Sequence, residues 1–560
     1  MKKFLSAMLI SALAIGGAAI AHADNPIVQT IYTGDGAPMV ANDTMYIYTG
    51  HDEDTATSWF DMREWHCYSS KDMANWTDLG SPLGVDTFTW AKKDAWAAQC
   101  IERDGKYYFY APVLTQVGDA EKRYIGVAVA DDPAGPFKDA IGGPLTDSEG
   151  TIIENIDPTI FIDDDANRTP YLYVGGGYKL SYIELDNDMV TAKTKLTDIN
   201  TSEGMVGPIG FVDDFYEAPW LFKRDGKYYM LFSSGLYWGQ PTFSQESVHY
   251  ATSDSPTGGW KYQGKVMDTL FNDVGGWCFT CHVGLAEYKN HSYMFYHCGK
   301  LPGGGGYHRS ECVEEFKFTD DGKIPFIPYT TTGPEQLEKL NPYNRVEAET
   351  MAFSGTTNPD PKGISLRTEI REDRSVNVCS IDDNDYIKVK GVDFGNDGAA
   401  AFTAAVACAD GKGGTIELHI DSANGAKIGE LPVTYTGGEY AWLEKSTGIS
   451  GATGVHDLYF VFKGDNEDMF KFDYWQFTQK ANDKQLVGIT ASAQPYKIDT
   501  ADKYDKKTAA ITATAIYANG DTEPLTNAEF TSDNTSVATV AQNGIVTAVS
   551  YGIANITVKS

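Results

Sequence analysis

One short pattern, an aromatic run that follows a polar turn, recurs five times in the first part of the chain. The five runs are residues 45–48, 107–110, 171–174, 228–231 and 293–296. They are spaced by roughly 60 residues, and no extended 3.6-residue hydrophobic period lies between them. Five all-β units of this size predict a five-bladed β-propeller, in which four-stranded sheets surround an axis.

A second strand precedes each aromatic run, and counting back from the first tyrosine of the run reaches an unusual residue. The residues reached are Asp35, Trp96, Glu217 and His282 at eleven positions and, in the third unit with its longer turn, Asp157 at fourteen. A repeat that only packed a core would have small apolar residues there. If the leading strand of each unit lies innermost, the five side chains meet at one end of the axis and predict a site. The alternative is that the acids only tie blade ends together through backbone N–H groups.

The rest of the chain predicts further β domains. At 560 residues it is too long for one domain. We expect the propeller over residues 24–329, a linker over 330–343, a β-sandwich over 344–480 and a small third β domain over 484–560. The overall fold class is therefore all-β.

The N-terminus and the charge limit where the protein works and what it binds. Lys2 and Lys3, an apolar stretch and Ala21-His22-Ala23 predict a cleaved signal peptide over residues 1–23, hence a secreted or periplasmic protein. A net charge of −32 argues against nucleic acid and anionic lipid as partners, and fits a neutral polysaccharide ligand. We expect a monomer. The eight cysteines, which include a C-x-x-C, are either structural thiols or disulfides of undetermined pairing.

Three segments around the carboxylates resemble glycoside hydrolase family 43, a family of five-bladed propellers. They are residues 32–40 around Asp35, 155–161 around Asp157 and 216–219 around Glu217. The resemblance implies that Asp35 is the general base, that Glu217 is the general acid, and that Asp157 raises the pKa of the acid and orients it. One departure is Gly36, which stands where family members often have proline.

The same resemblance suggests additional site residues. It implies that Arg309 lines the substrate pocket and that His282 is the axial histidine associated in many members with calcium, although a packed histidine is the alternative. Trp96, at an axial position, and Trp220, beside the Glu217 motif, are predicted substrate contacts, because sugar rings stack on aromatic side chains.

Residues 345–349, 436–442, 454–458 and 472–477 resemble a family 6 carbohydrate-binding module. The resemblance implies structural calcium held by Glu347, Glu349 and Asp473, and a sugar-stacking role for Trp442. Ser380 and Lys471 replace the second aromatic residue and the asparagine of the usual cleft, so the alternatives are sugar binding at a second face and a purely structural module. Residues 531–540 and 543–548 resemble a bacterial immunoglobulin-like domain of group 2.

Together these observations predict an exported inverting hydrolase of hemicellulose. The preferred activity is an α-L-arabinofuranosidase that removes arabinose from arabinoxylan, with structural calcium and no organic cofactor. A β-1,4-xylosidase of the same family is the alternative. A propeller that binds carbohydrate without catalysis is the alternative from another class.

Overall fold

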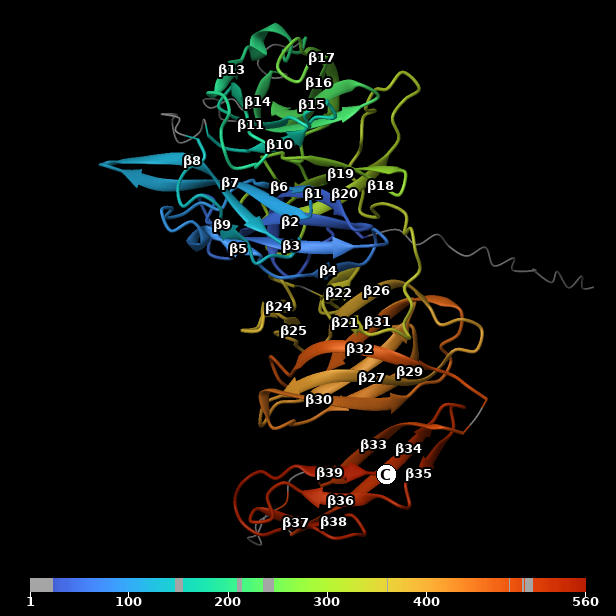
Figure 1. The fold of residues 1–560 in the computed structure, drawn as a ribbon. Helices are drawn as coiled ribbons and strands as arrows, with labels where there is room; N and C mark the ends of the chain where they lie inside the picture. Colours follow the sequence, from blue (N-terminus) through green and yellow to red (C-terminus); the bar gives the residue numbers. More distant parts are fainter. Residues whose placement is uncertain are drawn as a thin grey trace, which may run out of the picture.

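Three β domains follow one another along the molecule, from the propeller through the sandwich to the C-terminal domain (Figure 1). The computed structural model describes residues 24–146, 155–208, 214–234, 246–359, 361–482, 484–495, 498 and 507–560. The predicted signal peptide, residues 1–23, lies outside these ranges. Within them, the helical elements are two single 3-10 turns, η1 (Val85–Thr87) and η2 (Thr201–Glu203), and neither could cross a membrane.

Five sheets form the five blades of the predicted propeller. Blade one contains β1 (Tyr32–Ala41), β2 (Thr44–Asp52), β3 (Glu64–Ser70), β4 (Trp76–Asp78) and β5 (Leu83–Gly84). Blade two contains β6 (Gln99–Arg103), β7 (Lys106–Val117), β8 (Ala120–Ala130) and β9 (Lys138–Asp139). Blade three contains β10 (Thr159–Ile162), β11 (Pro170–Gly176), β12 (Lys179–Glu184) and β13 (Thr197–Ile199). Blade four contains β14 (Phe215–Arg224), β15 (Lys227–Ser234), β16 (Ser247–Ser253) and β17 (Lys261–Met267), and blade five β18 (Gly284–Tyr288), β19 (His291–Cys298) and β20 (Ser310–Phe316).

The blades close into a ring around their first strands. The first strand of each blade contacts the first strand of the next, and β18 returns to contact β1. The five aromatic runs form the second strands β2, β7, β11, β15 and β19. Leu172 of β11 packs toward blade two and Tyr173 toward blade four, because successive strand residues point to opposite faces. Each of the five interfaces between blades holds such a hydrophobic cluster, so the predicted propeller is confirmed.

The start of the described chain completes the last blade. The backbone N–H of Ile27 donates to the carbonyl of Glu311 at 2.7 Å, and that of Thr33 donates to the carbonyl of Arg309 at 2.8 Å. The Asn25 side-chain amide donates to the carbonyl of Val313 and accepts from its backbone N–H, each at 3.0 Å. The edge of β20 is therefore paired rather than exposed, which stabilises the ring without an additional strand.

The second domain is a sandwich of two sheets around one apolar core. One sheet contains β24 (Arg367–Ile370), β25 (Val376–Cys379), β32 (Lys471–Gln479), β27 (Ala399–Cys408), β30 (Gly438–Gly448) and β21 (Val346–Glu347). The other contains β23 (Phe353–Thr356), β26 (Asp385–Asp393), β31 (Val455–Lys463), β28 (Gly414–Ile420) and β29 (Ala426–Val433).

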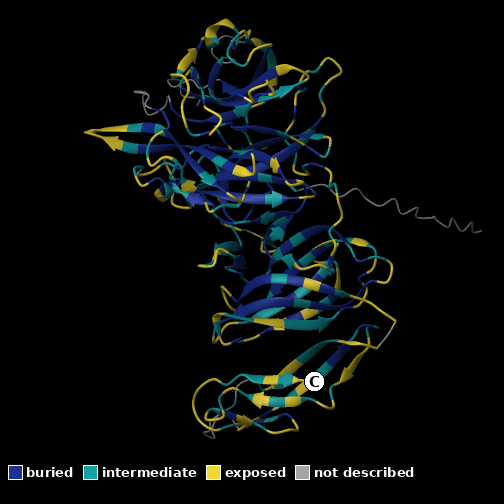
Figure 2. Cartoon of the chain, in the orientation of Figure 1, coloured by how far each residue is buried: buried dark blue, intermediate teal, exposed yellow. Residues whose placement is uncertain are grey.

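The third domain is smaller and less buried, as its yellow and teal strands in Figure 2 show. Its first sheet contains β33 (Leu486–Gln494), β34 (Thr508–Tyr517), β35 (Thr522–Pro524), β38 (Ile545–Ala548) and β37 (Ala538–Val540). Its second sheet pairs β36 (Glu529–Ser532) with β39 (Ile556–Lys559).

The sandwich contacts blade one directly, through strand pairing and hydrogen bonds. Strand β22 (Thr350–Met351), from the region predicted as sandwich, pairs with β4 and extends the blade-one sheet. The Gln336 amide, in the predicted linker, donates both to Asp72 of the propeller at 3.0 Å and to the carbonyl of Lys390 in the sandwich at 3.2 Å. The interface is thus built from specific hydrogen bonds, and the two domains share one sheet.

All eight cysteines are buried free thiols. The closest pair is in blade five, where the sulfurs of Cys298 and Cys312 are 3.5 Å apart. Of the two alternatives left by the sequence, the structure therefore shows structural thiols.

Candidate active site

The predicted axial residues stand at the beginnings of the five inner strands. Asp35 is in β1 and Glu217 in β14, while Trp96, Asp157 and His282 come just before β6, β10 and β18. The charges of Asp35 and Glu217 both act on Asp157, and His282 acts on Asp35, so the ionisable members of the set form one electrostatic group.

Irregular backbone aims the carboxylates toward the axis. The register of β1 shifts between Gly34 and Ala37, and that of β14 shifts between Glu217 and Trp220. Left-handed backbone occurs at the same places, with φ of 59° at Asp35, 52° at Asp157 and 55° at Ala218. Such bulges and strained residues redirect side chains and are frequent next to functional sites. A proline follows each carboxylate within three residues, and proline suits positions where the strand ladder is interrupted.

Asp35 is surrounded by cationic and neutral nitrogen groups. Its Oδ1 accepts a hydrogen bond from Arg309 Nη1 at 2.5 Å, and its backbone N–H donates to His297 Nδ1 at 3.1 Å. Arg309 is fixed by Asp52, which accepts from Nε and from Nη2 at 2.9 Å each. Burial alone would raise the pKa of Asp35, but the Arg309 guanidinium, with His297 and His282, holds it below its usual value. Asp35 is therefore an anion at neutral pH.

Two glycines make room for the groups beneath the base. A Cβ at Gly34 would lie 2.5 Å from Cζ of Arg309, and one at Gly36 would lie 2.3 Å from Oε1 of Glu311. Gly36, which departs from the family pattern, thus leaves the space that the Glu311 carboxyl group occupies. Burial, followed by the charge of Asp35, raises the pKa of Glu311 well above its usual range, so this carboxyl is neutral beside the base.

Glu217 is in the opposite electrostatic situation. Burial, then repulsion from Glu246 and from Asp35, raises its pKa well above the usual range, with Arg309 opposing the shift. Burial also raises the pKa of Glu246 to about 8, although its Oε2 accepts from the backbone N–H of Cys281 at 2.8 Å. Glu217 is therefore a protonated acid at neutral pH.

Asp157 is coupled to this acid through the backbone. Its Oδ2 accepts from the N–H of Ala218, the residue after Glu217, at 2.9 Å. Burial and the charges of Glu217 and Asp35 raise its pKa well above the usual range. Asp157 thus holds the backbone that carries Glu217, and the charge of Glu217 discourages ionisation of Asp157. The charges that raise the pKa of Glu217 itself are those of Glu246 and Asp35.

An ionised and a protonated carboxyl group at one end of the axis are suited to general base and general acid catalysis. Two groups with pKa values displaced in opposite directions are the arrangement that glycoside hydrolysis requires. The roles predicted for Asp35 and Glu217 remain predictions, and the electrostatics of the site agree with them.

An aromatic cluster lies next to the base. The Arg309 guanidinium lies over the Phe60 ring at 4.6 Å, and Phe60 contacts Trp59, Trp96, Phe279 and Tyr307. The ring of Trp96 is covered by Arg123 at 3.6 Å, and Arg123 is paired with Asp94 at 2.9 Å. Trp59 is 53% exposed, so it offers a free aromatic face at the rim, beside the half-buried Trp96 that we predicted.

The environment of Trp220 does not fit its predicted role as a substrate contact. Its side chain is 4% exposed and packs in the core between blades four and five. Its indole N–H donates to the carbonyl of Leu285 at 3.2 Å. As a correction, Trp220 is a core residue, because it lies beyond the bulge of β14 and faces the next blade.

The sandwich cleft is occupied by ion pairs. Lys471 is buried and its Nζ is 2.7 Å from Glu369 and 3.3 Å from Glu439. The guanidinium of Arg371 lies over the half-buried Trp442 at 5.0 Å. The tryptophan face predicted to stack on sugar therefore already has a cationic partner.

The predicted calcium ligands have suitable chemistry but are not pre-assembled. Glu347 is paired with Arg345 at 2.8 Å, Asp473 lies 3.6 Å from Arg371, and the buried Oε2 of Glu349 has no partner. These oxygen donors fit calcium, and the orphaned Glu349 oxygen is where a cation would be favourable. Burial lowers the pKa of His282, so its imidazole is neutral and able to act as a ligand.

Four residues of the site were not predicted from the sequence: Asp52, Glu246, His297 and Glu311. His297 carried a weak signal, because it is a polar residue in a largely apolar strand, whereas Glu311 lies in a strand with two other glutamates and did not stand out. Burial and the Arg309 charge lower the pKa of His297 to about 3, so this ring is neutral. Asp52 and Glu246 had no local signal that distinguished them from other surface acids.

Family models match all three domains. The model for glycosyl hydrolases family 43 matches residues 23–324, that for carbohydrate binding module family 6 matches residues 352–479, and that for the bacterial Ig-like domain of group 2 matches residues 504–560. The first covers more than half of the chain. The three predicted family resemblances are confirmed.

Individual relatives extend this result. The chain is 33% identical over 494 residues to an arabinoxylan arabinofuranohydrolase of Bacillus subtilis (strain 168), which covers 81% of this chain and 92% of that protein. It is 30% identical over 350 residues to xylosidase/arabinosidase 43A of Humicola insolens, and the match covers 53% of this chain and 98% of that protein. Among solved structures, this chain is similar to the crystal structure of a family 43 arabinoxylan arabinofuranohydrolase from Bacillus subtilis in complex with cellotetraose. The TM-score is 0.68 at 31% sequence identity, and the match covers 81% of this chain and 97% of that chain.

Proposed function

Because this chain belongs to glycoside hydrolase family 43, we propose that it is an exported, inverting α-L-arabinofuranosidase that releases arabinose from arabinoxylan. The observation that carries the proposal is the pairing of an ionised Asp35 with a protonated Glu217 at the propeller axis. The substrate is suggested by the Bacillus subtilis relative, which matches both the propeller and the sandwich. Export is suggested by the N-terminal segment.

In this proposal each carboxyl group has one task. Glu217 donates its proton to the glycosidic oxygen as the bond to the arabinosyl carbon breaks. Asp35 accepts a proton from a water molecule that attacks the same carbon from the opposite face. Arg309 keeps Asp35 ionised, and the hydrogen bond from Ala218 to Asp157 holds the backbone beside the acid. The sugar is released with inverted anomeric configuration.

The test is hydrolysis of two substrates by the purified protein. Arabinoxylan should release arabinose, and unsubstituted xylo-oligosaccharides should release no xylose. Proton NMR in the first minutes should show the anomer of opposite configuration to the bond that was cleaved. Release of xylose from the linear oligosaccharides, with arabinoxylan side chains intact, would refute the proposed specificity.

A β-xylosidase is the second candidate, and one observation favours it. A protein named xylosidase/arabinosidase 43A, from Humicola insolens, is 30% identical to this chain over nearly all of its own length. The catalytic carboxyl groups serve either reaction, because both need one acid and one base. The same two-substrate assay therefore decides between them.

Structural calcium belongs to the same proposal. Glu347, Glu349 and Asp473 would hold the ion in the sandwich, and His282 would contribute at the axis. Calcium would supply positive charge to carboxylates that now rely on Arg345 and Arg371. The orphaned oxygen of Glu349 supports the sandwich site.

A further inference from the structure

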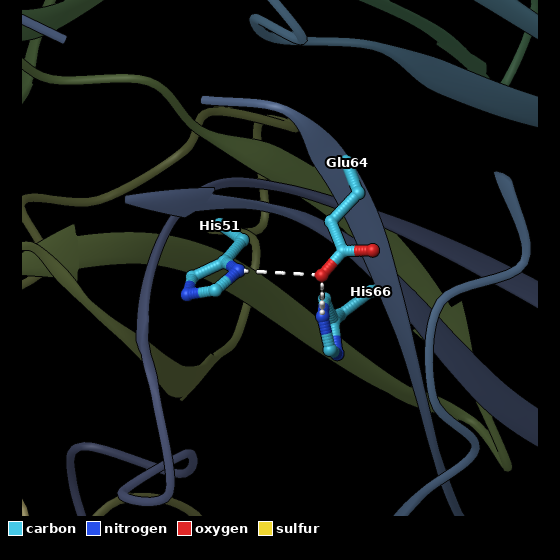
Figure 3. Close-up of side chains that lie close together, drawn as sticks. All are labelled: His51, Glu64 and His66. Atoms are coloured by element: carbon cyan, nitrogen blue, oxygen red, sulfur yellow. Dashed lines mark hydrogen bonds and ion pairs between the residues drawn. The ribbon is translucent and has the colours of Figure 1, made fainter. Parts of the chain in front are cut away.

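A histidine and carboxylate cluster on β2 and β3 of blade one contains neither the base nor the acid. Figure 3 shows His51, Glu64 and His66 with their polar ends facing one another. Among the residues that the structure describes, this is the one group of three or more His, Cys, Asp or Glu side chains whose ligand atoms all lie within 4.8 Å of one another. No part of the proposed hydrolysis uses it.

The sheet itself assembles the cluster. The register of β2 and β3 places Thr49 opposite His66 and Gly50 opposite Trp65, so His51 comes level with Glu64. Glu64 and His66 are two residues apart in β3, and residues two apart share one face of a strand. Three side chains from two rigid neighbouring strands therefore project from the same face, with no loop needed to hold them.

The separations suit a small metal ion. Oε1 of Glu64 is 3.1 Å from Nε2 of His66 and 3.5 Å from Nδ1 of His51. In a tetrahedral zinc site with bonds of ~2.0–2.1 Å, neighbouring ligand atoms are ~3.3–3.4 Å apart. Nδ1 of His51 is buried, and its 3.5 Å contact with Glu64 does not satisfy hydrogen-bond geometry. Glu64 has a side-chain exposure of 36%, which leaves solvent access for a fourth ligand.

A second layer of residues would orient the buried histidine. Nδ1 of His66 lies 3.9 Å from Oδ1 of Asp78 and has no hydrogen-bond partner of its own. Asp78 is anchored by the N–H of Gly80 at 2.8 Å and by the hydroxyl of Thr368 at 2.6 Å. A carboxylate behind a histidine is the usual arrangement in zinc sites, since it fixes the tautomer that presents Nε2 to the metal. Thr368 belongs to the sandwich, so the cluster is connected to the domain interface.

We propose that His51, Glu64 and His66 bind one divalent transition-metal ion of the zinc class, with water as the fourth ligand. Two imidazole nitrogens and one carboxylate favour zinc over calcium, which prefers oxygen ligands alone. Binding displaces any proton from Nε2 of His66 and leaves Nδ1–H directed at Asp78. The rival arrangement is a protonated His66 between Glu64 and Asp78, in which Nδ1 of His51 makes only the 3.5 Å contact with Glu64.

The test is zinc binding by the full chain after chelator treatment and dialysis. Isothermal titration with zinc chloride should give one site, and excess calcium should not compete for it. His51→Ala and Glu64→Gln should each weaken the zinc Kd by at least about tenfold, with unchanged circular dichroism. Cobalt bound in place of zinc should give the visible absorption of a tetrahedral site in the wild-type protein.

The matched control is His291→Ala. His291 is also a strand histidine paired with a glutamate, at 2.9 Å from Glu315, but no third ligand joins this pair among the described residues. This variant should bind zinc like the wild-type protein. Absence of a one-to-one zinc site in the wild-type protein, or unchanged affinity in His51→Ala, would overturn the proposal. The readout is metal binding, so the outcome is independent of whether the protein releases arabinose.

Discussion

The assignment of base and acid can be tested with one pair of variants, Asp35→Asn and Glu217→Gln. On arabinoxylan each should lower kcat/KM by ~10²–10⁴-fold, since each removes one half of general acid–base catalysis. At ~1.4 kcal/mol for each factor of ten, this is a loss of ~3–5 kcal/mol of transition-state stabilisation. Loss on arabinoxylan alone does not distinguish the two roles.

The structure indicates that both variants keep their fold. After Asp35→Asn, Arg309 retains its two 2.9 Å bonds to Asp52. The loss is then about one charge-assisted hydrogen bond, ~1.5–3 kcal/mol, and not the larger cost of an unpaired buried charge. Glu217 is protonated in the folded protein, so Glu217→Gln replaces one neutral group with another.

A substrate with a good leaving group separates the roles. Para-nitrophenolate leaves without a proton, so an aryl arabinofuranoside no longer needs the acid but still needs the base. Glu217→Gln should therefore recover most of its activity on para-nitrophenyl arabinofuranoside, and Asp35→Asn should stay inactive. Both substrates are assayed by kcat/KM, with thermal melting of each variant as the control for folding.

Two results would refute the reasoning. Recovery by Asp35→Asn together with failure of Glu217→Gln would mean that the roles are reversed. Turnover like that of the wild-type protein in either variant, on arabinoxylan, would mean that the catalytic carboxyl groups lie elsewhere.

Three further predictions concern the surroundings of the site and the sandwich. Glu246→Gln should move the alkaline limb of the pH profile of kcat to lower pH. Without repulsion from Glu246 the pKa of Glu217 falls, so the acid loses its proton at lower pH. An unchanged alkaline limb would show that Glu246 does not raise the pKa of Glu217. EDTA should lower the melting temperature, and added calcium should restore it, because calcium at one hundred times its Kd stabilises the folded state by ~2.7 kcal/mol per site. Glu349→Gln should respond less to both treatments than the wild-type protein, since only the axial site at His282 remains. Equal sensitivity would exclude the sandwich site. Trp442→Ala should leave retention of the protein on insoluble xylan unchanged, because Arg371 and the Lys471 ion pairs occupy the cleft. Weaker retention of this variant would show that the cleft binds sugar.

Much of the fold and the family could be predicted because their signals are local. The aromatic run after a polar turn recurs within each blade, and the upstream site residue stands eleven positions before it in four units and fourteen in the third. Asp35, Asp157 and Glu217 each carry a short motif with a proline, which reflects the interrupted ladder at that place. Periodicity and motifs survive in a linear sequence, since both depend on neighbours within about ten residues.

The partners of these residues were decided by the closing of the ring. Arg309 and Asp35 are 274 residues apart in sequence, and Arg309 and Asp52 are 257 apart, yet they form one buried network. Other partners are brought together by packing within one blade or between domains: Glu246, just before β16, acts on Glu217 in the same blade, and Asp78 meets Thr368 across two domains. No local pattern encodes these contacts.

The amino-acid sequence alone therefore determined the propeller, the family and the candidate carboxylates. The tertiary structure alone decided which carboxyl group is ionised and which is protonated, because burial and neighbouring charges set each pKa. It also decided that Trp220 is a core residue, since a bulge in β14 changes which face the following side chains occupy.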